Sequence, residues 1–268
     1  MQRGERILEP RAINLGGRPL ANGRVPAVCA PLVGRTREAL AAETAAVAAK
    51  RPDLLEWRVD FLEAIADTAE VLACARAVRA AAAGLPILFT RRAQREGGQP
   101  IALSEPQVLD LYEAVAASGT VDAMDFEMQN AAADVQRVRA LTRAHGLALV
   151  LSFHDFQRTP ATADLQERFA QAHRLGADVA KLAVMPQDLD DVHRLLGATL
   201  QASRSLPIPV VSMAMGGLGA VSRLCGGVFG SALTFAVGAA PSAPGQVPIE
   251  DVRTVLAVLQ RSTGLSGG

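Results

Sequence analysis

The sequence is poor in cysteine and has no long uninterrupted apolar run. It contains three cysteines, Cys29, Cys74 and Cys225, and their spacing matches no metal site. An odd number of cysteines favours free thiols in a reducing compartment, so we expect a cytoplasmic protein. No run of roughly 18 apolar residues is present, and the N-terminal segment lacks the apolar core of a secretory signal. We therefore expect neither a membrane span nor a membrane partner.

The sequence also lacks net charge. Its 27 Lys and Arg residues balance 27 Asp and Glu residues, so no basic field draws nucleic acid to the protein. Half of the residues are apolar, which is enough for one large core. The chain of 268 residues is close to the length of about 250 typical of one α/β barrel. We therefore predict a single catalytic domain over residues 1–268.

Lysine is the rarest charged residue in the chain. Only Lys50 and Lys181 are lysines, and the other basic residues are arginines. Lys50 ends an Ala-rich helical pattern, whereas Lys181 lies in the apolar segment 176–186. Unlike arginine, lysine can lose its proton and form an imine near neutral pH. Lys181 is thus either a side chain reaching water at a rim, or a desolvated amine whose pKa falls until it attacks a ketone.

Short apolar runs alternate with helical patterns, as in the βαβ units of a parallel sheet. The expected strands are 26–33, 54–60, 86–90, 123–126, 148–152, 179–183, 209–213 and 228–231. The expected helices are 36–51, 67–83, 105–118, 132–145, 162–175, 186–203, 220–224 and 249–262. Strands that are each followed by a helix favour a closed (β/α)8 TIM barrel. Turn signals at Gly16-Gly17 and Asn22-Gly23 suggest a hairpin within residues 1–24 that closes the barrel bottom.

Ionisable residues gather at the expected carboxyl ends of the strands, where a TIM barrel has its active site. They include Glu56, Arg58, Asp60, Arg91, Arg92, Glu96, Asp125, Glu127, His154, Asp155, Lys181 and Arg223. His154 and Lys181 would lie side by side, where a neutral imidazole can move protons, although a hydrogen-bonded core histidine is the alternative. The alternative for the charged residues of the second strand is a structural ion-pair network at the barrel mouth. The glycines of 215–219 could cradle phosphate or make a tight turn, and Arg223 suits a carboxylate.

Seven blocks in order resemble the type I 3-dehydroquinate dehydratase family. They are 56–60, 90–98, 152–156 with Thr159-Pro160, Ala180-Lys181 with Met185-Pro186, 215–223, 229–231 and 242–246. The resemblance runs from the first strand to the last helix. It implies a homodimeric hydro-lyase of the shikimate pathway, in aromatic amino-acid biosynthesis. Such an enzyme converts 3-dehydroquinate to 3-dehydroshikimate without a metal or an organic cofactor.

The resemblance also implies a role for each site residue. Lys181 would form an imine with the C3 ketone, and His154, supported by Glu96, would take the C2 proton and help the C1 hydroxyl leave. Arg223 would hold the substrate carboxylate. The other expected substrate contacts are Glu56, Trp57, Arg58, Arg92, Ser242 and Gln246, with Gln246 on a loop that closes over the site. Asp125 would belong to the surrounding polar network.

Two departures and two alternatives accompany this resemblance. The segment Cys29-Ala30-Pro31-Leu32 stands where many relatives have a substrate-contacting serine, so we assign it no role. The segment Thr90-Arg91-Arg92 has an arginine where relatives often carry an apolar residue, and spacing to Glu96 favours Arg92 as the arginine that faces the site. One alternative is a class I aldolase, which also uses a lysine on the strand that carries Lys181. Arg223, suited to a carboxylate, and the Glu96–His154 pair argue against an aldolase, because sugar-phosphate aldolases need a phosphate site. The other alternative is a non-catalytic barrel that binds a partner, which would have no need to keep Glu96, His154 and Lys181 together.

Overall fold

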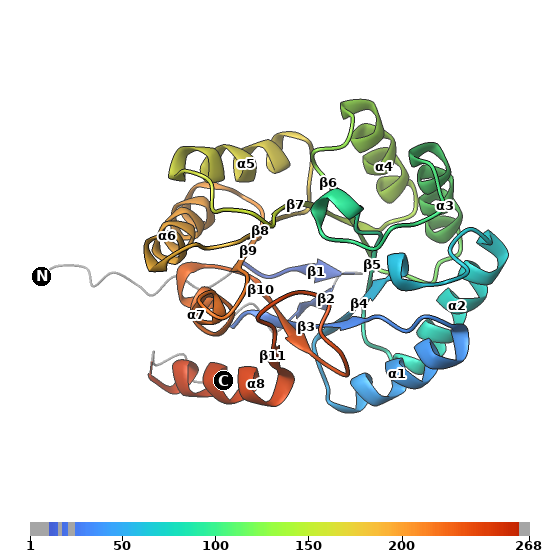
Figure 1. Ribbon diagram of the computed structural model, residues 1–268, viewed down its shortest axis with the longest axis horizontal. Coiled ribbons are helices and arrows are strands. Elements are labelled where there is room, and N and C mark those ends of the chain that lie inside the picture. The colour runs from blue at the N-terminus through green and yellow to red at the C-terminus, as the bar shows by residue number, and fades with distance from the viewer. Residues whose placement is uncertain (1–10, 16–17, 21–24, 263–268) are drawn as a thin grey trace, which may run out of the picture.

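The computed structural model describes residues 11–15, 18–20 and 25–262, and its strands form a parallel barrel (Figure 1). The barrel strands are β3 (Ala27–Leu32), β4 (Leu54–Arg58), β5 (Ile87–Thr90), β6 (Ala123–Glu127), β7 (Ala148–Asp155), β8 (Val179–Val184), β9 (Val210–Ala214) and β10 (Leu233–Val237). Each strand from β3 to β8 pairs in parallel with the next, and β10 pairs with β3. A bridge between Val210 and Ser231 closes the ring. The expected (β/α)8 TIM barrel is confirmed.

Helices surround the barrel in Figure 1. They are α1 (Arg37–Ala49), α2 (Thr68–Ala81), α3 (Glu105–Ala117), α4 (Ala132–Ala144), α5 (Thr162–Arg174), α6 (Leu189–Ser205), α7 (Ala220–Cys225) and α8 (Ile249–Ser262). Side-chain caps fix several of their starts: Asp67 accepts two backbone N–H groups of α2, and Asp188 accepts one of α6. Short 3₁₀ turns follow two strands and one helix: η2 (Val59–Phe61) follows β4, η3 (Gln94–Glu96) follows β5, and η4 (Gly226–Phe229) follows α7.

Two apolar clusters hold the barrel. The larger fills the layer between strands and helices, where Trp57, Phe89, Tyr112 and Phe126 make a chain of edge-to-face ring contacts. The smaller fills the bottom of the barrel. There the antiparallel pair β1 (Asn14–Leu15) and β2 (Arg18–Pro19) brings Ile13, Leu15 and Leu20 against the strands. The hairpin thus closes the barrel bottom as expected, although its predicted turn residues lie outside the described residues.

A repeated aspartate anchors the bottom of alternate strands. Each aspartate precedes an even strand of the barrel and accepts a backbone N–H from the strand before it; the pairs are Asp53 with Val28, Asp122 with Ile87, and Asp178 with Leu149. Each also meets an arginine, namely Arg253, Arg79 and Arg139. The residue directly before β10 is Ala232, and the nearby Ser231 hydroxyl accepts the Ser212 N–H. Among the described residues, the junction of β9 with β10 therefore has no counterpart of the Asp–Arg pair that is found at the other three.

The last barrel strand lies later in the chain than predicted. The strand expected at 228–231 is wrong, because Val228 and Phe229 belong to η4 and the strand is β10. Glycines explain the difference: Gly230 has a φ of 92°, and a Cβ on Gly227 would stand 2.5 Å from the Pro26 ring. Near the mouth, Ala236 and Val237 pair with β11 (Val247–Pro248) on the edge that faces β9. A seam therefore separates β9 from β10 at the mouth.

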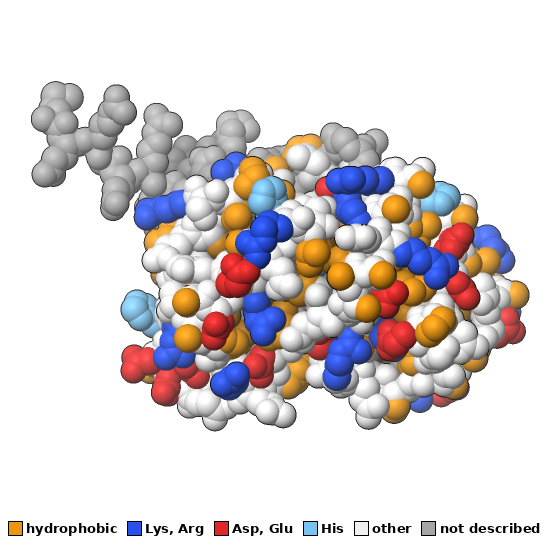
Figure 2. Space-filling model, turned by 90° about the horizontal axis from the view of Figure 1, so that it is seen from above, with side chains coloured by type: hydrophobic (Ala, Val, Ile, Leu, Met, Phe, Trp, Pro, Cys, Tyr) orange, Lys and Arg blue, Asp and Glu red, His pale blue; other side chains and the backbone are white. Residues whose placement is uncertain are grey.

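The outer surface carries charges of both signs. On the face drawn in Figure 2, blue and red side chains are interspersed with small apolar ones. Over the described residues, no helix is long and apolar enough to cross a membrane. All three cysteines are free, and Cys29 and Cys74 are buried.

Candidate active site

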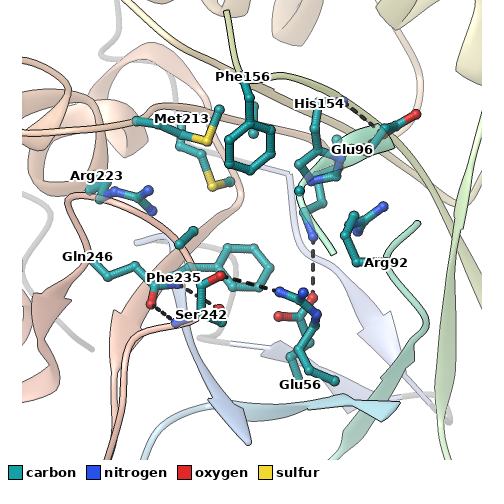
Figure 3. A pocket seen from close by; sticks show the side chains of 16 residues that line it. Glu56, Arg92, Glu96, His154, Phe156, Met213, Arg223, Phe235, Ser242 and Gln246 are labelled. Carbon is teal, nitrogen blue, oxygen red and sulfur yellow. Dashed lines mark hydrogen bonds and ion pairs between the residues drawn. The ribbon is translucent and has the colours of Figure 1, made fainter. Parts of the chain in front are cut away.

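A pocket opens at the carboxyl ends of the barrel strands (Figure 3). Its lining residues are Glu56, Arg58, Arg92, Glu96, Gly97, His154, Phe156, Lys181, Ala183, Met213, Met215, Arg223, Phe235, Ser242, Ala243 and Gln246. The residues therefore come from strand ends that are far apart in sequence. Every predicted site residue except Trp57 lines this pocket.

Lys181 lies in the middle of β8 and is 4% exposed. Its Nζ donates to Asp125 Oδ2 at 2.9 Å and to Glu56 Oε1 at 3.4 Å, and it stands 4.4 Å above the centre of the Phe235 ring. The side chain does not reach for water at a rim. Burial of the amine agrees with the second of the two alternatives that the sequence left open, a desolvated amine, but the amine is paired with two carboxylates rather than surrounded by apolar groups alone.

Asp125 is the carboxylate that joins the cations of the site. It is fully buried, and its Oδ1 accepts hydrogen bonds from Arg92 Nη2 at 2.8 Å and from the Ser152 hydroxyl at 2.6 Å. Burial favours the neutral acid, but Arg92 and Lys181 outweigh it and hold the pKa of Asp125 below its usual value. Asp125 therefore stays ionised and serves as the counter-charge to both cations.

His154 and Glu96 form a hydrogen-bonded pair beside Lys181. The strand β7 runs to Asp155, further than predicted, so His154 is held in the sheet next to β8. Its Nδ1 lies 2.9 Å from Glu96 Oε2, which faces it from η3. Burial, helped by Arg92 and Lys181, lowers the pKa of His154 well below 6.5, so the imidazole is neutral. Burial and the nearby Glu127 raise the pKa of Glu96 to about 8.

Arg92, and not Arg91, faces the pocket. Its guanidinium donates to Glu127 Oε1 at 3.1 Å, to the Ser152 hydroxyl at 2.9 Å and to Asp125. Burial opposes its charge, but the Asp125 and Glu127 carboxylates outweigh burial and raise the pKa of Arg92 above its usual value. Arg91 turns outward and pairs with Glu105 of α3. The spacing argument from the sequence agrees with this arrangement.

Arg223 of α7 is 1% exposed and lies across the pocket from Arg92 in Figure 3. Its Nη2 donates to the Pro244 carbonyl at 3.0 Å, while Nε and Nη1 have no partner. Burial lowers the pKa of Arg223 to about 10, so the guanidinium remains charged at neutral pH. Buried N–H groups of a cation are costly to leave unpaired. The arrangement is therefore suited to an anionic group entering the pocket.

The segment 238–246 borders the pocket above the seam. The Gln246 side chain accepts the Ser242 N–H at 2.9 Å and donates to the Ser242 hydroxyl at 3.2 Å. The Ser242 carbonyl accepts from Arg58 Nη1 at 3.4 Å. Arg58 is fixed by Asp60, which accepts from its Nε and Nη2 at 2.8 Å each. The ion pair of the second strand is thus structural on the Asp60 side, while Arg58 also lines the pocket.

Trp57 does not reach the pocket, and its predicted substrate contact is wrong. Its side chain is fully buried in the layer outside the barrel, and the centre of its ring lies 5.5 Å from the centre of the Phe89 ring. Alternation along β4 explains this, because neighbours on a strand point to opposite faces and Glu56 and Arg58 face inward.

Sequence reasoning also missed apolar walls of the pocket. Phe235 was not assigned because its strand was placed too early, and Phe156 and Met213 received no role. Phe156 packs so closely on Gly97, at a φ of 84°, that a Cβ there would stand 2.2 Å from the ring. The apolar run 232–237 is the signal that could have placed Phe235.

The glycines of 215–219 serve a tight turn. A Cβ on Gly219 would stand 2.1 Å from the Ala214 carbonyl oxygen, and Gly216 has a φ of 70°. This geometry accounts for both glycines without a phosphate. Among the described residues, no group of three or more His, Cys, Asp and Glu side chains is arranged to hold a metal ion.

The chain is similar to a well-defined set of proteins. The family model for type I 3-dehydroquinase matches residues 28–263. A 3-dehydroquinate dehydratase of Albidiferax ferrireducens is 52% identical over 254 residues, which cover 95% of this chain and 96% of that protein. The crystal structure of 3-dehydroquinate dehydratase from Geobacillus kaustophilus is 49% identical, with a TM-score of 0.91 over 94% of this chain and 98% of the other. The type I enzyme from Clostridium difficile, solved with covalently modified comenic acid, is 32% identical, with a TM-score of 0.89 over 94% and 99%.

Proposed function

The chain belongs to the type I 3-dehydroquinase family, and from this premise we propose that it dehydrates 3-dehydroquinate through an imine on Lys181. The observation that carries the proposal is the position of Lys181. Its buried amine lines the same pocket as a neutral histidine and an arginine with unpaired donors, at the mouth of a TIM barrel. An amine, a proton acceptor and an anion site are what an imine-based elimination from a keto acid requires.

Imine formation is the first step of the proposed reaction. The Lys181 ammonium passes a proton to a neighbouring base, and the free amine attacks the C3 carbonyl carbon. The carbonyl oxygen leaves as water, and a C=N bond remains. The cationic imine withdraws electrons from C2, which makes the C2 proton easier to remove. Asp125 and Glu56, which contact the amine before reaction, also lie where the positive charge of the imine develops.

Elimination is the second step. His154 takes the proton from C2, and the electrons of the C2–H bond form an enamine with C3. The enamine electrons then form the C1–C2 double bond of the product as the C1–O bond breaks, and the hydroxyl leaves as water with a proton from His154. Hydrolysis of the remaining imine releases 3-dehydroshikimate and the Lys181 amine. General acid–base assistance by a positioned histidine contributes about 10²–10⁴-fold to such a step.

Substrate binding rests on the rest of the pocket lining. Arg223 offers its two unpaired N–H donors to the substrate carboxylate. Glu56, Arg58, Arg92, Ser242 and Gln246 hold the ring hydroxyls, and Gln246 lies on the segment that borders the pocket. Trp57 is left out of this set because its side chain lies outside the barrel.

We carry three further expectations as proposals. The whole chain acts as one catalytic domain, since the pocket draws its residues from Glu56 to Gln246. The protein is cytoplasmic, which three free thiols support. It forms a homodimer, as the family resemblance implies. Light scattering tests the dimer, because it would report twice the 28.0 kDa mass of the chain.

Trapping with borohydride tests the chemistry. The protein is incubated with 3-dehydroquinate, reduced, digested, and the adduct located by mass spectrometry, while the enone absorbance of dehydroshikimate reports turnover. We expect an adduct on Lys181 and none after Lys181→Ala. Lys50, bound to the Gly238 carbonyl and Glu250 away from the pocket, provides the matched control, and Lys50→Arg should keep both adduct and turnover. An adduct confined to Lys50, or turnover without any adduct, would contradict the proposal.

A further inference from the structure

Glu127 is a buried carboxylate at the end of β6 that does not line the pocket. It is 1% exposed, and its Oε1 accepts the backbone N–H of Ala93 at 2.6 Å and a hydrogen bond from Arg92 Nη1 at 3.1 Å. Its Oε2 accepts from Arg95 Nη2 at 2.9 Å. Burial of a carboxylate is costly unless it is paired and hydrogen-bonded, and here Ala93, Arg92 and Arg95 supply the donors.

The partners of Glu127 all belong to one short segment. Ala93 is the residue from which η3 (Gln94–Glu96) starts, and Arg92 and Arg95 flank that start. The third residue of η3 is Glu96, whose Oε2 holds the ring and the backbone of His154. Glu127 therefore fixes the turn that brings the Glu96 carboxylate to the histidine. Among the described residues, Glu127 is the one β6 side chain that accepts the Ala93 N–H.

The charge of Glu127 also acts on Glu96. The ionisable groups that act on Glu96 come from several elements; they are Glu127 and Asp125 on β6, Arg92 and Arg95 around η3, His154 on β7, and Arg168 on α5. Burial raises the pKa of Glu96 most, and Glu127 is the strongest of the charges that raise it further. Arg92 and Arg95 act in the opposite direction.

We propose that Glu127 is a positioning residue for the dehydration, which aims Glu96 at His154 and sets the protonation of that pair without touching substrate. The proposal rests on the proposed function, since it needs Glu96 and His154 to move the C2 proton. It assigns a task to an ionisable strand-end residue to which the family resemblance gave none.

The same strand supplies a matched control. Asp122, just before β6, also accepts a backbone N–H, from Ile87 at 2.7 Å, and pairs with an arginine, Arg79. It lies at the bottom of the barrel, away from the pocket. Asp122→Asn and Glu127→Gln thus each neutralise an anchoring carboxylate, the first just before β6 and the second at its last residue.

The test compares steady-state kinetics, pH profiles, borohydride trapping and thermal unfolding for these variants. For Glu127→Gln we expect kcat to fall by about tenfold or more, with KM and imine trapping on Lys181 nearly unchanged. Loss of the Glu127 charge favours ionised Glu96, so the limb of the kcat profile that reports the Glu96–His154 pair should move to lower pH by about one unit. Glu127→Asp keeps the charge and should leave this limb in place while lowering kcat partly.

Arg95 tests the direction of this pKa shift, because its charge acts on Glu96 in the opposite sense to Glu127. It is half exposed, it bridges Glu127 to Asn130, and its charge lowers the pKa of Glu96. Arg95→Gln should therefore move the same limb to higher pH, opposite to Glu127→Gln. This variant changes a side chain at the surface, so it serves even if Glu127→Gln fails to fold.

Two results would overturn the proposal. One is a Glu127→Gln variant whose kcat and pH limb match the wild type. The other is a variant that loses kcat, imine trapping and thermal stability together, with the limb unmoved as in Asp122→Asn, which would mark an anchor and nothing more. Absence of turnover or of a Lys181 adduct in the wild-type protein would instead contradict the proposed function, so the two failures are distinguishable.

Discussion

One oxygen of Glu96 holds both the ring and the backbone of His154. Oε2 lies 2.9 Å from Nδ1 and accepts the His154 N–H at 3.0 Å, whereas Oε1 is buried without a partner. The histidine is thereby fixed in rotation, with its other ring nitrogen left for the pocket. Burial raises the pKa of Glu96 to about 8 and lowers the pKa of His154 well below 6.5, so Glu96 is the member of the pair that holds a proton near neutral pH.

The opposite pKa shifts of Glu96 and His154 predict how the free energy of unfolding depends on pH. The folded pKa of Glu96 is raised from 4.5 to about 8, so its burial as a neutral acid favours the folded state at low pH, and this contribution is lost as pH rises. His154, with a folded pKa well below 6.5, acts in the opposite sense, and its effect is complete above 6.5. Of these two groups only Glu96 titrates between pH 6.5 and about 8, so its contribution should make stability fall there.

Glu96→Gln should flatten that fall in stability between pH 6.5 and about 8. Denaturant unfolding followed by fluorescence measures it, because Trp57 is the single tryptophan and is buried against Phe89. The surface variant Glu113→Gln, which removes one of the two carboxylates paired with the exposed Arg137, is the control and should keep the wild-type slope. An unchanged slope in Glu96→Gln would show that another group titrates.

Replacement of His154 should separate imine formation from elimination. His154→Ala should lower kcat by about 10²–10⁴-fold, because a positioned acid–base group contributes that much, while substrate still forms an imine with Lys181. Single-turnover mass spectrometry after borohydride measures the trapped intermediate, which should accumulate. His145→Ala at the exposed end of α4 is the control and should turn over normally. Loss of the trapped imine in His154→Ala would assign the histidine to the first step instead.

Arg223 should govern affinity for the carboxylate. Arg223→Ala should raise KM by about 10- to 100-fold, the equivalent of a charged hydrogen-bond interaction of about 1.5–3 kcal/mol. Arg223→Lys should recover part of this, since it restores the charge without the planar fork. Isothermal titration with a substrate analogue that lacks the carboxylate should show little difference between wild type and Arg223→Ala. The exposed Arg137→Ala provides a neutral comparison, and a KM unaffected by Arg223→Ala would rule out this role.

Gly97 should be intolerant of a side chain for two reasons that can be separated. Its φ of 84° is unfavourable for alanine, and a Cβ would stand 2.2 Å from the Phe156 ring. Gly84 has a nearly equal φ of 81° with nothing within 4 Å of the added atom. Gly84→Ala should therefore lower stability by the backbone strain alone, about 1 kcal/mol. Gly97→Ala should cost more and should also lower kcat, because the pocket wall and the turn behind Glu96 must move. Equal unfolding free energies for the two variants would contradict the crowding at Phe156.

The barrel and most of its site were predictable because they depend on local patterns. Buried parallel strands read as apolar runs, and a lysine inside such a run can hardly escape the core. The failures came where tertiary contacts decide. Val228 and Phe229 are apolar, but Gly226, Gly227 and Gly230 let them turn, and the strand begins later. Trp57 stood inside a matching block, yet strand alternation turned it outward.

Contacts through loops could not be predicted from the sequence. Glu127 meets the Ala93 N–H, 34 positions earlier in the chain, only because two loops at the mouth adopt particular conformations. The pairing of Lys181 with Asp125 likewise depends on which strand ends face one another across the barrel. Residue type and spacing give the chemistry that is available, while the partner of each charge follows from the folded geometry.

The seam between β9 and β10 is the one junction of the described barrel where neighbouring strands are not hydrogen-bonded along their length. At the mouth, β11 pairs with the β10 edge that faces β9. Among the described residues, this junction also has no counterpart of the Asp–Arg pairs found at the other three alternate junctions. Arg223 and the segment 238–246 both border this seam, and Thr234 ties α7 to it through the Arg223 carbonyl. If the open edge between β9 and β10 lets these strands move apart, amide exchange should be faster along β9 and β10 than along the other barrel strands, and substrate should slow it most there.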